Sequence, residues 1–196
     1  MAIVVEHDKR KSEILDKSLD IFVEEGYEDV TYQKIADRCG ITRTTLYVYF
    51  KNKREIFQFS IKQLIERLEN DLKAVLTEDI TNAEKLEKML HAVLEVCEAN
   101  KKLFNILLPY LISLQKAGKD SGERVRRRVV RMRHYMTQVF LAGQKAGEFR
   151  EESVKTLNEM FYGLIEAAIF RLAILNDATC PELYDVIDAA IEGIRK

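Results

Sequence analysis

The segment from Thr31 to Arg54 constrains the fold most, because it combines two short helical patterns with a sharp break between them. Ile35 marks the apolar side of the first pattern, and Leu46 and Phe50 mark that of the second. Gly40, between the two patterns, supplies the backbone freedom that a tight turn requires. The segment therefore predicts a helix-turn-helix, in which the second helix is presented at a fixed angle.

Residues with capping ability stand at the borders of these patterns. A threonine side-chain oxygen accepts a hydrogen bond from an unpaired backbone N–H in the first turn of a helix. Thr31 and Thr42 each precede a helical pattern and are therefore predicted N-caps. Gly26 follows the helical pattern of residues 9–25 and is a predicted left-handed cap.

Charge is distributed unevenly around this segment, although the formal net charge of the whole chain is only -1. Residues 1–30 carry 4 Lys or Arg against 9 Asp or Glu, whereas residues 31–54 carry 6 against 1. Contacts with phosphates supply most of the non-specific affinity of proteins for DNA, so a local positive surface matters more than the overall charge. The pattern favours double-stranded DNA as a partner; a solvated pair of amphipathic helices is the alternative.

The remaining sequence is helical in pattern and offers ample material for a core. Hydrophobic residues make up 47% of the 196 residues, and the chain has 2 Pro and 8 Gly, so long helices are favoured over an all-β fold. Apolar residues recur at helical spacing over residues 9–25, 53–76, 82–99, 101–115, 123–146, 152–175 and 181–195. Residues before about His7 are expected to form a mobile arm, and Pro109 is expected to kink or restart its helix.

Targeting segments, membrane spans and cysteines bear on the cellular compartment of the protein. The first residues lack a signal-peptide pattern, and no stretch approaches the length of a membrane span. Cys39, Cys97 and Cys180 are widely spaced and odd in number. We expect a cytoplasmic protein without membrane association, with reduced thiols and redox sensing as the alternative.

An enzymatic reading finds little support. The sequence contains no G-x-S-x-G, no H-E-x-x-H, no phosphate-cradling glycine loop and no paired cysteines of the metal-binding type. His91 and Glu95 are four residues apart and could share a helix face as metal ligands, but a surface or capping role for His91 is favoured. We therefore predict a non-enzymatic protein with no cofactor and no metal.

The block from Ile14 to Phe57 resembles the DNA-binding domain of the tetracycline-repressor (TetR) family of bacterial regulators. The resemblance rests on the Ile14, Leu15, Leu19 and Phe22 stripe, Gly26-Tyr27, Thr31, Ile35-Ala36, Gly40-Ile41, and the run from Thr45 to Lys53. Ser18 and Thr44 depart from it, since the family often has Ala and Gly there. The resemblance implies an all-α fold of about nine helices, with a helix-turn-helix domain at residues 1–53 and an effector-binding and dimerisation domain at residues 54–196.

By this resemblance, one set of residues is expected to contact DNA: Thr31, Gln33, Thr42, Arg43, Thr44, Thr45, Tyr47, Val48, Tyr49 and Lys53. Arg43 suits guanine, Gln33 suits adenine, and Val48 or a threonine methyl suits the thymine methyl group. Thr31, Tyr47, Tyr49 and Lys53 are expected to anchor phosphates, with core packing as the alternative for the two tyrosines.

The resemblance also implies a small-molecule pocket and a homodimer. The candidate lining of a pocket for an apolar or amphipathic effector is Leu64, Leu68, Met89, Val93, Phe104, Leu108, Met132, Tyr135, Met136 and Phe161, although any helical core needs such residues. The last two helical patterns are apolar on more than one face, so a partner is expected to cover them, with an internal core as the alternative. The expected interface is Leu157, Phe161, Leu164, Ala168, Leu172, Leu183, Ile187 and Ile191.

Between Arg124 and Ala146 the chain carries six arginines and no acidic residue. These guanidinium groups suit an anionic effector such as an acyl thioester. Helical spacing nevertheless places Arg124, Arg127, Arg128 and Arg131 together, which favours a solvated outer face. The resemblance implies a repressor that binds a palindromic operator as a homodimer and is released by a small molecule. Activation of transcription and control by a partner protein are the alternatives.

Overall fold

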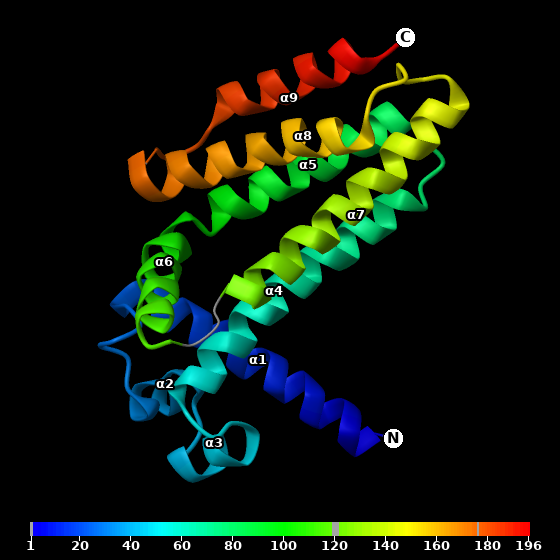
Figure 1. Cartoon of the computed structure of the whole chain (residues 1–196). Helices are drawn as coiled ribbons and strands as arrows, with labels where there is room; N and C mark the ends of the chain where they lie inside the picture. Colours follow the sequence, from blue (N-terminus) through cyan, green and yellow to red (C-terminus); the bar gives the residue numbers. More distant parts are fainter. Residues whose placement is uncertain (1, 119–121, 176) are drawn as a thin grey trace. The chain divides into compact units, whose positions relative to one another are not determined.

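The computed structural model describes residues 2–118, 122–175 and 177–196, and within these ranges the chain folds into nine α-helices and one π-helical turn (Figure 1). This confirms the prediction of an all-α fold. The elements are α1 (Ala2–Glu25), α2 (Tyr32–Cys39), α3 (Arg43–Tyr49), α4 (Lys53–Leu76), α5 (Asn82–Ala99), α6 (Lys101–Lys116), α7 (Gly122–Ala146), α8 (Val154–Phe170), η1 (Arg171–Leu175) and α9 (Pro181–Ile194). Two compact units, residues 1–67 and 68–196, divide the chain within α4.

The first unit packs α1, α2, α3 and the first half of α4 around a small aromatic core. The Phe22 and Phe57 rings meet edge to face with their centroids 4.9 Å apart, and Ile35, Leu46 and Phe50 are buried beside the turn. Among the apolar residues of α1, Leu19 and Val23 are partly exposed and Ile21 is buried. The periodic pattern therefore located the apolar face of α1 correctly but not its edges.

The start of α1 differs from the prediction. A mobile arm was expected to about His7, yet the helix begins at Ala2. No proline or glycine interrupts residues 2–10. Once the buried part of a helix has formed, each added residue gains a backbone hydrogen bond without a new nucleation cost, so the helix extends beyond its packed region.

The second unit has one core, which α5, α7, α8 and α9 share with the end of α4. Met89, Leu90, Met136, Phe140 and Phe161 are each fully buried there. The Glu148 carboxylate caps α5, because it accepts hydrogen bonds from the backbone N–H of Asn82 at 2.7 Å and from its side-chain amide at 2.8 Å. The Gly147-Glu148-Phe149-Arg150 run thus ties the turn after α7 to the start of α5.

Two helices depart from their predicted course. α6 continues through Pro109 to Lys116, so the helix does not restart there. The long apolar pattern of residues 152–175 is an α-helix only to Phe170, and η1 follows it as a π-helical turn. The predicted loop over residues 116–122 falls partly on residues 119–121, outside the described residues. Among the described residues no helix is both long and apolar enough to cross a bilayer.

Candidate nucleic-acid interface

The two predicted caps and the glycine turn fix α2 and α3 relative to each other. The Thr31 hydroxyl accepts from the Lys34 N–H at 3.2 Å, and the Thr42 hydroxyl accepts from the Thr45 N–H at 3.1 Å. Gly40 closes α2 at φ +66°, a left-handed conformation that glycine adopts without a Cβ clash. The sequence prediction of both N-caps and of the turn is confirmed.

α3 has one buried side and one exposed side. Leu46 is 0% exposed and Phe50, just after the helix, is 1% exposed, so this side is committed to the core. Val48 is 70% exposed, so its side chain is accessible to another molecule. The exposed side also carries Thr42, Arg43, Thr44, Thr45 and Tyr47. All six of these side chains were predicted to contact DNA.

Arg43 is held against two tyrosine rings. Its Nη2 donates to the Tyr47 hydroxyl at 3.1 Å, and its guanidinium carbon lies 5.7 Å from the Tyr47 ring centroid and 5.9 Å from that of Tyr32. The two rings stack with centroids 4.5 Å apart and planes at 26°. Sequence reasoning missed Tyr32, although a large aromatic residue at the first position of α2 was a visible signal.

The Tyr32 hydroxyl joins the beginning of α2 to the end of α3. It donates to the Phe50 carbonyl at 2.6 Å. Burial, and then the nearby Tyr47 and Glu55 groups, raise the pKa of Tyr32 to about 12, so the hydroxyl remains a donor at neutral pH. Tyr32 therefore contributes a fixed ring surface to α3 from the neighbouring helix.

Two other predicted DNA contacts already have partners inside the unit. Gln33 donates to Asp37 Oδ1 at 2.8 Å along the exposed side of α2. The half-buried Tyr49 ring stacks on His7 of α1 with a centroid distance of 4.7 Å. Gln33 would have to exchange its Asp37 contact for a base edge, whereas Tyr49 is held by rings of the same unit.

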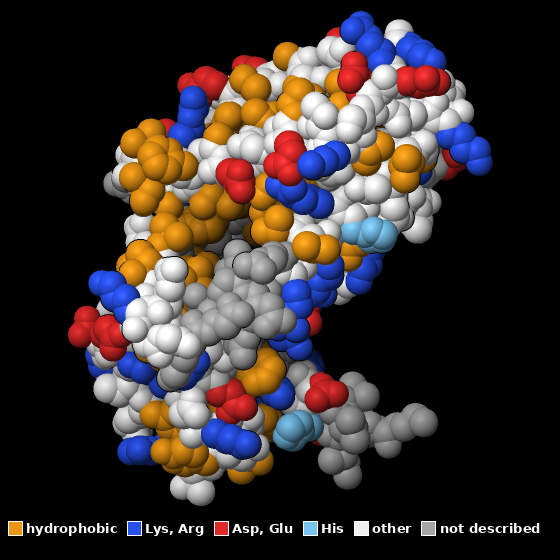
Figure 2. Space-filling model, viewed as in Figure 1, with side chains coloured by type: hydrophobic (Ala, Val, Ile, Leu, Met, Phe, Trp, Pro, Cys, Tyr) orange, Lys and Arg blue, Asp and Glu red, His pale blue; other side chains and the backbone are white. Residues whose placement is uncertain are grey.

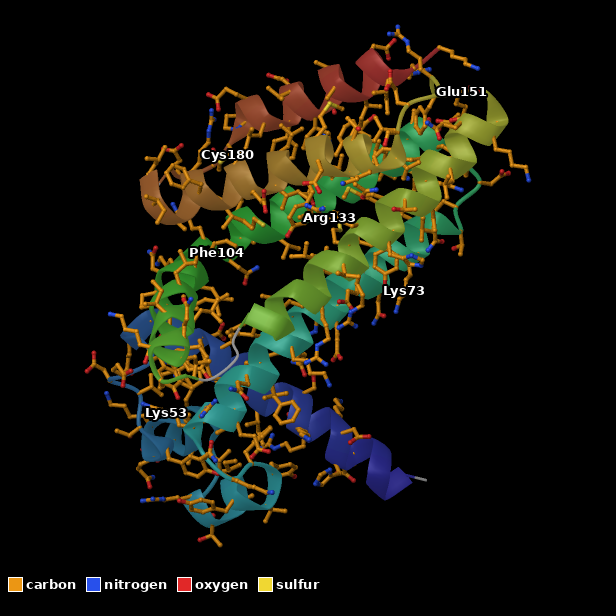
Figure 3. The ribbon with its side chains drawn as sticks, viewed as in Figure 1. Lys53, Lys73, Phe104, Arg133, Glu151 and Cys180 are labelled. Carbon is orange, nitrogen blue, oxygen red and sulfur yellow. The ribbon has the colours of Figure 1, made fainter. Side chains whose placement is uncertain are left out.

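Lys53, predicted to anchor a phosphate, is tied to the turn after α1 (Figure 3). Its Nζ donates to the Tyr27 carbonyl at 2.7 Å and to the Glu28 carbonyl at 3.1 Å, and it lies 4.6 Å from the Tyr27 ring centroid. An ammonium group has three donors. If Lys53 binds a phosphate, the same ammonium group also holds the start of α4 to the turn after α1.

The charge of this unit is partly neutralised by α1. Lys34 of α2 pairs with Glu25 of α1, and Arg38 of α2 pairs with Glu24 of α1. The pair with Glu24 raises the pKa of the Arg38 guanidinium. Two of the six basic residues that suggested DNA binding thus face α1 carboxylates.

The candidate effector residues lie mainly in the core of the second unit. Met89, Val93, Tyr135, Met136 and Phe161 are buried in that core. Leu68, Phe104 and Met132 are partly buried against it. Leu108 is half-buried on α6, and Leu64 belongs to the first unit. The placement agrees with core packing as well as with a pocket lining.

Two polar atoms of α7 and α8 are buried without a hydrogen-bond partner among the described residues. Asn158 is 6% exposed and donates to the Thr137 hydroxyl and the Val154 carbonyl, each at 3.0 Å, but its Oδ1 accepts nothing there. Nε of Arg133 is likewise buried without a partner among the described residues, although Nη1 and Nη2 of Arg133 bind both carboxylate oxygens of Glu159 (Figure 3). A buried unpaired acceptor costs free energy, so a ligand with a donor would be favoured there.

The arginine run is engaged where it is described. Arg131 pairs with Glu69 at 3.0 Å, and Arg133 pairs with Glu159, which raises the pKa of Arg133 and lowers that of Glu159. The side chain of Arg127 is exposed. The side chains of Arg124, Arg126 and Arg128 lie outside the described residues. The grouping of Arg124, Arg127, Arg128 and Arg131 therefore stays a prediction.

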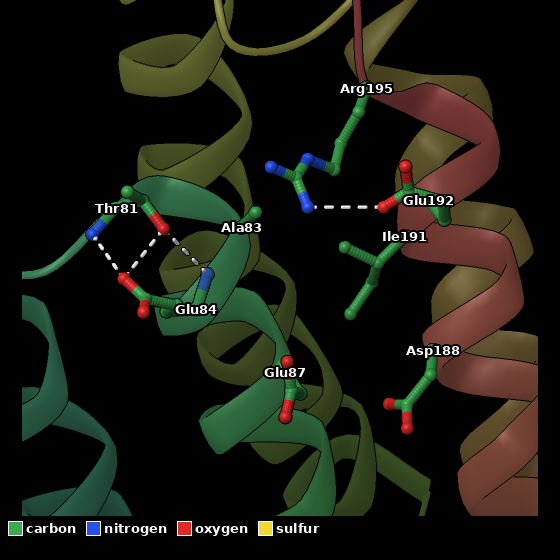
Figure 4. A pocket seen from close by; sticks show the side chains of 8 residues that line it. All are labelled: Thr81, Ala83, Glu84, Glu87, Asp188, Ile191, Glu192 and Arg195. Carbon is green, nitrogen blue, oxygen red and sulfur yellow. Dashed lines mark hydrogen bonds and ion pairs between the residues drawn. The ribbon is translucent and has the colours of Figure 1, made fainter.

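A polar pocket of about 320 Å³ lies between α5 and α9 (Figure 4). The carboxylates of Glu87 and Asp188 extend into it from the two helices. Nε2 of His91 lies 2.8 Å from Asp188 Oδ1. The atoms of Glu87, His91 and Asp188 that could bind a metal ion lie within 4.8 Å of one another. His91 thus pairs across to α9 rather than with Glu95, the residue considered with it from the sequence.

The predicted dimer-interface residues belong to the chain's own core. Seven of them are at most 5% exposed, and Leu164 is partly buried. The buried ones are Leu157, Phe161, Ala168, Leu172, Leu183, Ile187 and Ile191. The same elements expose other apolar side chains: Met160, Phe170, Ile174, Leu175 and Val186. Figure 2 shows apolar side chains gathered at the surface over the end of α8 and η1.

The three thiols are buried. Burial raises the pKa of Cys39 and of Cys180, and it raises the pKa of Cys97 to about 12, with smaller contributions from the neighbouring Cys180 and Glu98. Because the thiolate is the reactive form, these settings disfavour the redox-sensing alternative.

Comparison with known proteins places this geometry in context. Residues 14–58 match the family model described as "Bacterial regulatory proteins, tetR family". The fatty acid metabolism regulator protein of Bacillus subtilis is 24% identical over 180 residues, which are 89% of this chain and 87% of that protein. The transcriptional regulator SrpR of Pseudomonas putida is 27% identical over 84% of this chain and 76% of its own length.

Solved structures show the same fold. A TetR transcription regulator of Haloarcula marismortui superposes with a TM-score of 0.79 at 22% identity, covering 96% of this chain and all of that one. A transcriptional regulator of Saccharomonospora viridis in complex with choline gives a TM-score of 0.78 at 18% identity, covering 96% and 99% of the two chains. The likeness extends over both compact units.

Proposed function

We propose that this chain represses transcription from a palindromic operator as a homodimer and that a small molecule releases it. The premise is that the chain belongs to the TetR family of DNA-binding transcriptional regulators. The observation that carries the DNA-reading part is the exposed side of α3, where Arg43, Thr44 and Val48 stand clear of the core. In helix-turn-helix proteins the second helix enters the major groove, where base edges can be distinguished.

Each exposed side chain suits a particular contact. Arg43 would donate to guanine, Val48 would pack on a thymine methyl group, and Gln33 would pair with adenine after leaving Asp37. The Thr31, Tyr47 and Tyr49 hydroxyls and Lys53 would bind phosphates and set the register. Thr42 and Thr45, whose hydroxyls lie 2.8 Å apart, would contact the same strand at the start of α3.

The exposed apolar residues of α8 and α9 support a homodimer. Met160 is 41% exposed, Phe170 is 54% exposed and Val186 is 43% exposed. The inner stripe that includes Leu157 and Ile187 already fills the core, so the second copy would cover the outer side of these helices. Two recognition helices would then meet half-sites about 34 to 36 Å apart.

An apolar or amphipathic effector is supported by the lining residues and by Asn158. Methionine and aromatic side chains of α5, α7 and α8 adapt to varied apolar groups. The unpaired Oδ1 of Asn158 would accept a hydrogen bond from a donor on the effector. Two similar proteins support a small-molecule effector, since one is named for fatty acid metabolism and the structure of the other was solved in complex with choline.

The alternatives retained are activation of transcription and control by a partner protein. Thermal denaturation with metabolite panels separates small-molecule control from partner control, because a ligand that binds the folded state raises its stability. Linkage adds a second criterion: operator DNA must weaken effector binding by the factor by which the effector weakens operator binding. We place this activity in the cytoplasm, where the DNA of the cell is accessible.

The decisive experiment is selection of genomic DNA fragments by the purified protein, with an Arg43→Ala, Thr44→Ala double variant as control. Both replaced side chains are exposed, so the variant is expected to fold. The expected result is one palindromic site that the variant no longer enriches. Failure of the folded, dimeric protein to enrich any site would contradict the proposal.

A further inference from the structure

We infer that Tyr32 is a positioning residue for sequence readout, because it holds the Arg43 guanidinium in the orientation in which Arg43 meets a base. This inference rests on the proposed base-reading role of Arg43. Tyr32 lies on α2 and Arg43 lies on α3, so the contact joins the two helices of the helix-turn-helix.

The Arg43 guanidinium lies beside the stacked pair of tyrosine rings and is held there by contacts with both. Its guanidinium carbon lies within 6 Å of both tyrosine ring centroids, and one N–H binds the Tyr47 hydroxyl at 3.1 Å. A guanidinium group carries five N–H donors, so the donors that do not bind Tyr47 can meet a bidentate acceptor. Guanine offers such an acceptor pair in the major groove.

Tyr32 is the fixed member of this cluster. Its hydroxyl donates to the Phe50 carbonyl at 2.6 Å, and its ring stacks on the Tyr47 ring at 4.5 Å. Tyr47 is 49% exposed and belongs to α3 itself, and the Tyr32 ring supports it from α2. Tyr32 thus restricts the Tyr47 ring, and the two rings together restrict Arg43.

Restriction of Arg43 before binding lowers the cost of recognition. A flexible arginine must lose side-chain freedom when it meets a base, whereas an arginine already held by two tyrosines has lost part of it. This effect concerns the base that Arg43 reads, whereas the proposed phosphate contact of Tyr47, which Tyr32 also supports, carries no sequence information. A loss of Tyr32 is therefore expected to reduce discrimination at one operator position more than it reduces overall affinity.

The test compares four proteins in binding to the selected operator and to operators with each base pair changed: wild type, Tyr32→Ala, Arg43→Ala and the double variant. Arg43→Ala is expected to lower discrimination at one position about tenfold or more. Tyr32→Ala is expected to lower it about two- to tenfold at the same position. In the Arg43→Ala background, Tyr32→Ala should change discrimination no further.

Tyr32→Phe serves as the conservative variant. It keeps the ring and the stack but loses the bond to Phe50, so it should retain discrimination even where its melting temperature falls. A merely structural role of Tyr32 would instead make discrimination follow the melting temperature across Tyr32→Ala and Tyr32→Phe.

The outcomes separate this inference from the proposed function. Unchanged base preference in Arg43→Ala would overturn the reading role of Arg43 itself. A normal effect of Arg43→Ala with no effect of Tyr32→Ala on discrimination would overturn the positioning role alone. A further loss in the double variant would mean that Tyr32 contacts DNA directly, which also overturns it.

Discussion

The ring of Phe149 occupies the space that a β-carbon on Gly143 would need, since such an atom would lie 2.2 Å from Phe149 Cδ2. Phe149 is fully buried, and the N–H groups of Glu148 and Phe149 both donate to the Gly143 carbonyl, at 2.9 and 3.2 Å. The turn after α7 therefore closes directly on one glycine of that helix.

Gly143→Ala is expected to destabilise the protein by about 1 to 3 kcal/mol, because a buried ring must move to admit the methyl group. The loss should lower the melting temperature by roughly 2 to 4 °C per kcal/mol in a chain of this size. Gly193→Ala on α9 is the matched control, since a β-carbon there meets nothing within 4 Å and alanine favours a helix. Equal melting temperatures for the two variants would contradict this account.

Val48→Ala is expected to leave stability unchanged and to weaken operator binding. The side chain is 70% exposed, so its truncation removes little packing in the free protein. Loss of the contact with a thymine methyl group should cost about 1 kcal/mol, or roughly fivefold in affinity. Titration of labelled operator with each protein, beside thermal denaturation, measures both quantities. A large fall in melting temperature would show that Val48 packs in the protein.

Lys53→Ala is expected to lower both the stability of the protein and its affinity for DNA. It removes two hydrogen bonds to the turn after α1, so the melting temperature should fall, and it removes a charge from the proposed DNA surface. Binding to operator and to unrelated DNA should weaken together, and the slope of log affinity against log salt should decrease by about 1. Lys73→Ala, an exposed residue in the last turn of α4, is the control for lost charge. An unchanged salt slope in Lys53→Ala would mean that Lys53 is structural alone.

Val186→Glu is expected to convert the proposed dimer to monomers and to weaken operator binding about tenfold or more, because linked half-site contacts are lost. Val186 is 43% exposed on α9, so the charge should be tolerated within one subunit. Sedimentation measures the oligomeric state. Ile112→Glu is the control, since Ile112 is an apolar residue of α6 that is 52% exposed. A dimeric Val186→Glu protein would place the interface elsewhere.

The thiols are expected to react with Ellman's reagent at pH 8 only after unfolding. Burial raises the pKa of Cys97 from 9.0 to about 12, so the folded chain keeps this proton where the unfolded chain loses it. The resulting contribution to stability is complete below pH 9 and is lost as the pH rises toward 12. Cys97→Ala should therefore show a shallower fall of stability over that range. Rapid reaction of a thiol in the native protein would contradict this picture.

Local signals in the sequence predicted the helix-turn-helix well. Thr31, Thr42 and Gly40 act through bonds and backbone angles within a few residues, so their roles can be inferred without knowledge of the tertiary fold. The exposure of Val48 likewise follows from its place two residues after Leu46, on the opposite side of the helix.

Contacts between helices were predicted poorly. Tyr32 supports Arg43 from another helix, and Lys53 binds carbonyls 25 and 26 residues away, so neither partner can be inferred from spacing. The burial of the expected interface residues of α8 and α9 within the chain's own core could not be inferred either. These helices are apolar on two sides, and periodicity does not tell which side faces the core of the same chain.

The pairs of Lys34 with Glu25 and of Arg38 with Glu24 also shape how the protein meets DNA in solution. They cancel positive charge beside α1, whereas Arg43 and Lys51 remain on an exposed part of the unit. A duplex is therefore expected to be attracted less to the side of α1 than to Arg43 and Lys51, which would orient collisions before any base is read. This steering of the encounter reaches about 10 Å at 0.1 M salt, so the rate of association should depend on ionic strength even where the final complex is unchanged.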